Sequence, residues 1–234
     1  TFSSRGLGDV YKRQASSEAR GDRGVVVPLE LIDDSLGLVT NLPNQQAGGV
    51  SLLEQQAACP LKAHLNHKLG IRPLEGEAEG LTPGERGGVL HEALKHLFSS
   101  LRNSDQISAL TAVDREVLIG AAADEAVRGL KAPVRDRVGL SALDLERQRL
   151  IGILAAWLEV EGSRDTSFTV ELSEEPLEWE CGGLNLSLKV DRVDRLSTGQ
   201  RIVIDYKSSA GQSATDWSQS PLKSPQLPCY SQVI

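Results

Sequence analysis

The spacing of apolar residues predicts a largely helical N-terminal half. From Gly49, leucines and alanines recur at three- and four-residue steps, which predicts a helix that ends before Pro73. Residues 82–85 read Thr-Pro-Gly-Glu, a capping box that predicts the start of the next helix. The helices predicted after the first one cover residues 83–101, 112–130 and 142–161.

Around Thr166 the period of the pattern changes to two, which is typical of strands. Turn residues at 181–183 and 197–199 separate the alternating segments, so short connections join them in a meander. Helices followed by a meander predict an α/β fold in which helices flank one mixed sheet. The strands are predicted near residues 168–172, 184–194 and 201–206.

Composition fits one globular domain in a reducing compartment. The chain has 234 residues, of which 40% are hydrophobic and 24% are charged, enough to bury a core. Its three cysteines are scattered, which argues against a disulfide framework and favours a cytoplasmic setting. No apolar run approaches the roughly 18 residues of a transmembrane helix, so no membrane association is expected.

The two ends of the sequence suggest an incomplete protein. Residues 1–14 resemble a translated sequencing adapter and are expected to be a non-native leader. The polar, glycine-rich residues 15–48 are expected to be a connector. Residues 49–234 then form the predicted domain, which we expect to be truncated at its C-terminus because it stops inside an apolar pattern.

The chemistry is concentrated in two predicted strands. Asp205 and Lys207 are two positions apart and so share one face, and Asp191 comes from the preceding strand of the same hairpin. Converging carboxylates suit a hard cation such as Mg²⁺, and a nearby lysine can orient the attacking water of phosphodiester hydrolysis. On spacing alone, a solvated strand end and a surface ion pair between Asp191 and Arg192 explain the pattern equally well.

Four separated motifs carry a family resemblance. They are the Cys-Pro helix at 55–63, the Gly-x-x-x-His helix at 86–94, the Asp-x-Lys strands at 190–207 and the Gln-x-x-x-Tyr segment at 225–230. In this order they resemble the RecB-type nuclease family of the PD-(D/E)xK superfamily. Within it, residues 48–234 are most similar to the C-terminal nuclease domain of AddB-like DNA-repair proteins. The resemblance implies a restriction-endonuclease-like fold.

The resemblance also implies roles for the candidate residues. His91, Asp191 and Asp205 would be ligands of Mg²⁺ or Mn²⁺, the Tyr206 carbonyl would add a further contact, and Lys207 would be catalytic with the two aspartates. Without the other motifs, His91 is more simply a satisfied histidine beside the apolar stripe of its helix.

Other singled-out residues have weaker assignments. The resemblance places Gln226 and Tyr230 at the border of the site, where they would help to hold DNA, although they also fit a helix-surface pair. Glu171 matches a frequent family acid without an assigned role. His64 and His67 are interpreted as surface residues, because no acid or cysteine completes a metal site with them.

Cys59 raises the question of an iron–sulfur cluster. In some AddB-like nucleases a cysteine at this place joins three more near the C-terminus to hold such a cluster. The resemblance allows a cluster in the full-length protein, but this chain stops before any such trio, and Cys181 and Cys229 lack cluster spacing. A half-buried helix cysteine is therefore expected at position 59.

The resemblance implies an exonuclease-type DNA nuclease domain of a helicase–nuclease repair and recombination complex. A net charge of −7 is unusual for a free-standing DNA binder, so we expect a helicase subunit or helicase-like domain to deliver single-stranded DNA. One alternative is a non-catalytic DNA-binding scaffold of the same fold. Another is an unrelated α/β domain with a chance Asp-x-Lys, which the distance between His91 and Asp205 would discriminate.

Overall fold

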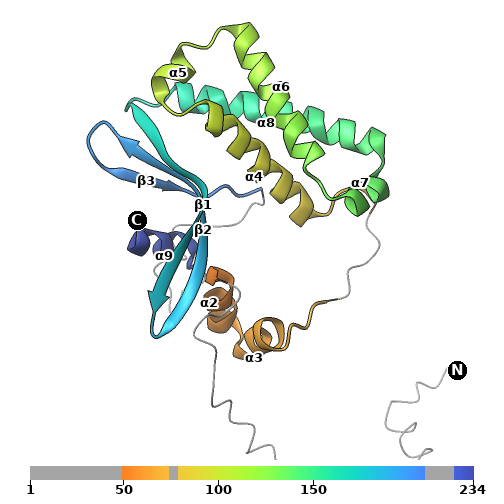
Figure 1. Ribbon diagram of the computed structural model, residues 1–234, viewed down its shortest axis with the longest axis vertical. Coiled ribbons are helices and arrows are strands. Elements are labelled where there is room, and N and C mark those ends of the chain that lie inside the picture. Colours follow the sequence, from red (N-terminus) through yellow and green to blue (C-terminus); the bar gives the residue numbers. More distant parts are fainter. Residues whose placement is uncertain (1–48, 74–78, 209–223) are drawn as a thin grey trace, which may run out of the picture. The chain divides into compact units, whose positions relative to one another are not determined.

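A computed structural model describes residues 49–73, 79–208 and 224–234. They form an α/β fold in which helices flank a three-stranded antiparallel sheet (Figure 1), so the predicted fold class is confirmed and is consistent with a restriction-endonuclease-like fold. The predicted leader at 1–14 and connector at 15–48 lie outside the described residues. Among the helices of the described ranges, none has the length and apolar character needed to cross a membrane.

The helices before the sheet fall into two groups by their contacts. Helices α4, α6 and α8 pack on one another and α4 also contacts strand β1, whereas α2 contacts β2 and α9 (Figure 1). The described helices are α2 (Gly49–Ala58), α3 (Pro60–Ala63), the π-helix η2 (His64–Lys68), α4 (Pro83–Ser100), α5 (Ser104–Ser108), α6 (Ala112–Arg128), α7 (Ala132–Val138), α8 (Leu140–Gly162) and α9 (Gln226–Val233).

Helix α4 begins as the sequence predicts. The Thr82 hydroxyl accepts a hydrogen bond from the Glu85 backbone N–H, and the Glu85 carboxylate accepts one from the Thr82 N–H, which completes the capping box. One side of the helix is buried between the neighbouring helices and the sheet, and this fixes its rotation. The buried residues are Val89, Leu90, Ala93, Leu94, Leu97 and Phe98.

The helix predicted from Gly49 is not continuous. It breaks at Cys59, whose backbone is extended (φ −162°, ψ 103°), and restarts at Pro60 as α3 and then the π-helical turn η2. Proline has no N–H and disfavours a helical residue before it, which explains the break. Two short helices, α5 and α7, were not predicted, because five and seven residues are too few to show a helical period.

The described strands form one sheet in the order β1-β2-β3, and both pairings are antiparallel. The sheet was expected to be mixed, but no parallel pairing is found among the described residues. Gly182 and Gly183, with φ of 58° and 80°, form the two-residue turn between β1 and β2, a conformation that glycine adopts without strain. Strand β1 is longer than predicted and contains a bulge between Val170 and Leu172. The strands are β1 (Phe168–Cys181), β2 (Leu184–Leu196) and β3 (Arg201–Ile204).

Strand β2 changes character along its length. Up to Lys189 it alternates buried and exposed residues, but residues 190–194 are all buried, so both faces of the sheet are covered there. One hydrophobic cluster lies among α4, α6 and α8 and includes Phe168 and Val170. A second includes Leu186, Leu188 and Tyr230, together with residues of α2 and α9.

A buried ionic cluster ties α8 to β2. Arg192 is fully buried and donates hydrogen bonds to Asp194 (2.6 Å) and to Glu161 of α8 (2.8 Å). Its guanidinium lies 3.8 Å from the centroid of the Phe98 ring. The surface ion pair between Asp191 and Arg192 considered from the sequence is therefore wrong, because Arg192 belongs to this structural cluster.

Candidate metal centre

Helix α4 and the first two strands bring three ligating side chains together. The Nδ1 atom of His91 lies 3.3 Å from Oε1 of Glu174 in β1 and 3.3 Å from Oδ1 of Asp191 in β2. Ligand atoms of these three residues all lie within 4.8 Å of one another, close enough to surround one cation. The proximity of His91 and Asp191 agrees with the sequence prediction, whereas their role as ligands stays a prediction.

Asp191 is held in place by the chain that leads out of β3. Its Oδ2 atom accepts a hydrogen bond of 2.7 Å from the Tyr206 backbone N–H, while Oδ1 faces His91. The residue is 5% exposed, so the carboxylate is largely removed from water. A buried carboxyl group needs polar partners, and Asp191 has a backbone amide and an imidazole among its partners.

Glu174 is the member of the group that the sequence pattern did not predict. It lies between residues that pair with Arg192 and Val190, and therefore stands opposite Asp191 across the hairpin. Its backbone has a φ of 55°, which is uncommon for a residue with a side chain. Its second carboxylate oxygen forms an ion pair with Lys189. Burial raises the pKa of Glu174, but hydrogen bonds from His91 and Lys189 outweigh it and bring the pKa below its ordinary value.

Glu171, the acid singled out by resemblance, lies elsewhere. Its carboxylate forms ion pairs with Arg195 and Arg201, 2.7 and 2.8 Å away. The bulge at this point inserts an extra residue into β1, so the alternation seen at its start cannot be extended to position 174. The sequence could indicate Glu174 only as an acid opposite Asp191, and that position follows only from the register of β1 with β2.

Both nitrogens of His91 are engaged. The hydrogen bonds to Asp191 and then to Glu174 raise the pKa of His91 to about 10, against the opposing effect of burial. The Nε2 atom lies 3.0 Å from the Tyr206 carbonyl oxygen, which fixes the ring orientation. The recorded contact of the Tyr206 carbonyl, predicted as a metal contact, is thus with His91. If Nδ1 binds a cation, the Tyr206 carbonyl keeps the imidazole ring oriented by accepting a hydrogen bond from Nε2.

The side chains of Asp205 and Lys207 meet, but they do so just after β3, which ends at Ile204 and is shorter than the predicted 201–206. The Lys207 ammonium lies 2.8 Å from Oδ2 and 3.0 Å from Oδ1 of Asp205, while Tyr206 between them is buried against Trp157. Burial raises the pKa of Asp205; Lys207 lowers it and the Asp191 carboxylate raises it, and the net shift is upward. Asp191 thus acts electrostatically on the Asp205 carboxyl, although Asp205 is not a member of the three-residue group around His91.

Gln226 and Tyr230, on α9, are linked to Lys207 by hydrogen bonds. The Lys207 ammonium donates a hydrogen bond of 2.6 Å to Oε1 of Gln226. The Gln226 amide nitrogen donates to the Tyr230 hydroxyl, 2.9 Å away. Both residues therefore border the candidate site, as the resemblance implies; a contact with DNA stays a prediction.

The cysteines and the other histidines singled out lie apart from this group. Cys59 is exposed, so the half-buried side chain expected there is wrong: it precedes the first turn of α3 and does not lie inside a helix. His64 is exposed and His67 is half-buried. Cys181 is half-buried and Cys229 is buried. The ligating group found among the described residues contains no cysteine.

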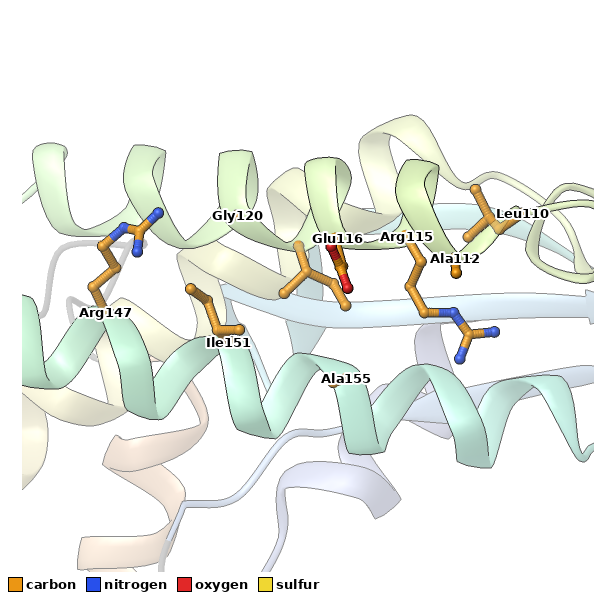
Figure 2. A pocket seen from close by; sticks show the side chains of 9 residues that line it. Leu110, Ala112, Arg115, Glu116, Gly120, Arg147, Ile151 and Ala155 are labelled. Atoms are coloured by element: carbon orange, nitrogen blue, oxygen red, sulfur yellow. The ribbon is translucent and has the colours of Figure 1, made fainter.

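A hollow of about 590 Å³ lies between α6 and α8, away from these residues (Figure 2). Its lining is mainly apolar, with Arg115 and Glu116 contributed by α6 and Arg147 by α8. Figure 2 shows Arg147 and Ile151 extending from α8 toward α6. No candidate ligand lines this hollow, so it does not bear on the chemistry of the metal centre.

The donor set fits a hard or borderline divalent cation. Glu174 and Asp191 offer carboxylate oxygens, which suit Mg²⁺ and Mn²⁺, and the His91 imidazole adds a nitrogen donor that Mn²⁺ tolerates well. Asp205, predicted as a further ligand, is not a member of this group, and its role as a ligand stays a prediction. Buried carboxylates of like charge repel one another, and a cation relieves that repulsion. The residues present therefore fit such a metal, although the geometry does not select between the two.

Comparison with known proteins agrees with this chemistry. The family model described as the PD-(D/E)XK nuclease superfamily matches residues 49–234. The chain therefore belongs to the PD-(D/E)XK nuclease superfamily. A search of curated proteins found no match to the chain.

Proposed function

We propose that this domain hydrolyses DNA phosphodiester bonds with Mg²⁺ or Mn²⁺. The observation that carries the proposal is the meeting of His91, Glu174 and Asp191 within 4.8 Å, in a chain that belongs to a nuclease superfamily. The Asp205–Lys207 pair beside them supplies the Asp-x-Lys part of the site. Phosphate-ester hydrolysis is extremely slow without a catalyst, and such a site provides the charges that the reaction requires.

His91, Glu174, Asp191 and Asp205 would hold the cation. When bound, the metal lowers the pKa of a coordinated water and neutralises charge on the phosphate. The carboxylates of Asp191 and Asp205 would supply the negative charge that keeps the cation in place, and the backbone amide of Tyr206 keeps Asp191 oriented. The Tyr206 carbonyl keeps the His91 ring oriented through Nε2.

Lys207 is the group that would act on substrate. Its side chain is 31% exposed, whereas the side chain of Asp205 beside it is 4% exposed. An ammonium at this point can orient the attacking water and stabilise the charge that develops on the phosphoryl oxygens. Hydrogen bonds to Asp205 keep it beside the carboxylates that would hold the metal.

We further propose that the domain belongs to the RecB-type branch, near AddB-like proteins, and works as an exonuclease in a helicase–nuclease repair complex. The four ordered motifs support this branch. The net charge of −7 supports delivery of single-stranded DNA by a motor, because an acidic domain captures a polyanion poorly by itself. A weak and only slightly salt-dependent affinity of the isolated chain for single-stranded DNA would be expected.

The test is cleavage of end-labelled single-stranded and double-stranded oligonucleotides by the purified chain. Fragments should form with Mg²⁺ or Mn²⁺ and disappear with EDTA. The Asp191→Asn variant, purified in parallel, controls for contaminating nucleases. DNA binding without metal-dependent cleavage would instead support the non-catalytic scaffold of the same fold.

A further inference from the structure

Three hydrogen bonds link Lys207 to the strand that carries Asp191. The Lys207 ammonium donates to Oε1 of Gln226 at 2.6 Å, and the Gln226 amide donates to the Tyr230 hydroxyl at 2.9 Å. The Tyr230 hydroxyl then donates to the Lys189 carbonyl oxygen at 2.6 Å. Because Lys189 lies two residues before Asp191 in β2, this chain of bonds connects Lys207 to the backbone beside the metal centre.

The direction of each bond is fixed by chemistry. An ammonium only donates, so the Gln226 oxygen must face Lys207 and the amide nitrogen must face Tyr230. The Tyr230 hydroxyl accepts from Gln226 and therefore has its proton free for the Lys189 carbonyl. Tyr230 is 3% exposed and packs with Leu186 and Leu188, so it is a rigid anchor for Gln226.

A role of Tyr230 in holding DNA does not account for these contacts. Its ring is buried in the second hydrophobic cluster, and its hydroxyl is engaged by protein groups on both sides. The Gln226 side chain likewise accepts a hydrogen bond from Lys207 through its oxygen and donates one to Tyr230 through its amide nitrogen. What both residues offer in this arrangement is a fixed position for the lysine.

We propose that Gln226 is a positioning residue for Lys207, held in turn by Tyr230. The inference rests on the proposed nuclease function. The ammonium has three protons; Asp205 and Gln226 accept from it, which leaves a proton to direct at water or phosphate. A lysine side chain is otherwise flexible, and fixing it in advance removes the entropy cost of ordering it during the reaction. Helix α9 therefore completes the active site.

The first arm of the test compares Gln226→Leu with Gln226→Glu in steady-state cleavage. Leucine removes the acceptor, and kcat should fall about 10- to 100-fold with KM changed less than about twofold. Glutamate keeps an acceptor for Lys207 and should lose less of kcat than leucine does. A DNA-contacting residue predicts the opposite order, because a carboxylate repels phosphate and raises KM. That order would overturn the proposal.

Two further variants test whether the hydrogen bonds, rather than the stability of α9, are responsible for the effect on kcat. Tyr230→Phe keeps the buried ring but removes the hydroxyl, and should lower kcat as Gln226→Leu does, to a smaller extent. Ser231→Ala, an exposed position of α9 whose hydroxyl donates to the Pro228 carbonyl, should behave like the parent. Equal loss in Ser231→Ala would show that α9 matters only for stability and would contradict the proposal.

The second arm does not depend on catalysis. In protein with ¹³C-labelled lysine, the Lys207 Cε resonance, assigned by its loss in Lys207→Arg, should shift in Gln226→Leu, because the ammonium loses an acceptor, and should stay close to its parental position in Ser231→Ala. An unchanged resonance in Gln226→Leu would overturn the positioning role. If the parent fails to cleave DNA while these resonances respond as expected, the proposed function fails and the positioning of Lys207 stands.

Discussion

The Nδ1 atom of His91 lies 3.3 Å from Oδ1 of Asp191, so α4 and β2 meet at the candidate metal centre. This relationship joins the helical part of the described domain to its sheet. It also explains the raised pKa of His91, because hydrogen bonds to Asp191 and Glu174 stabilise the imidazolium. A proton and a metal ion would therefore compete for the Nδ1 atom of His91.

The first prediction follows from that competition and concerns metal-free protein. The folded-state pKa of His91 is raised to about 10 from an ordinary value near 6.5, so its contribution to stability is complete below pH 6.5. That contribution is lost as pH rises toward 10, and the free energy of unfolding in EDTA should fall over this window. Urea titrations at several pH values measure the effect. In His91→Gln the free energy of unfolding should vary less with pH over this window. A pH dependence as steep as that of the parent would refute the prediction.

Metal binding should also depend on His91. His91→Ala removes one ligand, and Mn²⁺ affinity measured by calorimetry should fall more than about tenfold, with a melting temperature close to that of the parent because Leu90 and Leu94 supply the packing. His96→Ala, on the same helix and more exposed, is the matched control. Unchanged affinity together with a large loss of stability would make His91 a structural residue.

Glu174 and Glu171 offer a matched pair of substitutions in one strand. Glu174→Gln should weaken Mn²⁺ binding more than about tenfold, because it removes a charged donor from the group around His91. Glu171→Gln should leave Mn²⁺ binding unchanged, because that carboxylate pairs with Arg195 and Arg201. Calorimetry on both variants would reject our assignment if Glu171 proved to be the more important acid.

Lys207 separates catalysis from metal binding. Lys207→Ala should lower the cleavage rate by about 100-fold or more while Mn²⁺ still binds, because the carboxylates persist. Asp205→Ala should lose both cleavage and metal affinity. Lys95→Ala, whose ammonium pairs with Glu92 on α4, is the control lysine. Cleavage by Lys207→Ala at the parental rate would exclude the assigned role.

The buried ionic cluster predicts a stability effect unrelated to catalysis. Arg192→Ala leaves Asp194 and Glu161 buried without their main partner, and should destabilise the fold by about 3–5 kcal/mol. Arg195→Ala, at the exposed end of the same strand, should cost less than about 1 kcal/mol. Chemical denaturation of both variants gives the comparison, and equal effects would show that the cluster is not what secures α8 to β2.

The sequence predicted the elements whose signals are local. The capping box at Thr82 and the contact between Asp205 and Lys207 depend on neighbours within a few residues, and both are found in the structure. Glu174 could not be predicted in this way, because its place depends on the bulge in β1 and on the register with β2. The burial of Arg192 likewise depends on α8, which lies far away in the sequence.

The same distinction applies to α9. The spacing of Gln226 and Tyr230 indicated a helical pair at the border of the site, but not which groups they contact. The bond from Tyr230 to the Lys189 carbonyl requires β2 and α9 to pack together, which is a tertiary feature. Sequence patterns thus located the site, whereas its internal contacts required the fold.

The most direct test of the central claim is the rate of single-stranded DNA cleavage as a function of Mn²⁺ concentration, for the parent and for Asp191→Asn. Asp191 contacts both His91 and the Tyr206 amide, so its carboxylate is central to the site. The parent should cleave with a saturable dependence on Mn²⁺, and Asp191→Asn should remain folded by circular dichroism and fail to cleave at every concentration. Cleavage by Asp191→Asn at the parental rate and Mn²⁺ midpoint, or the absence of cleavage by the parent, would contradict the account.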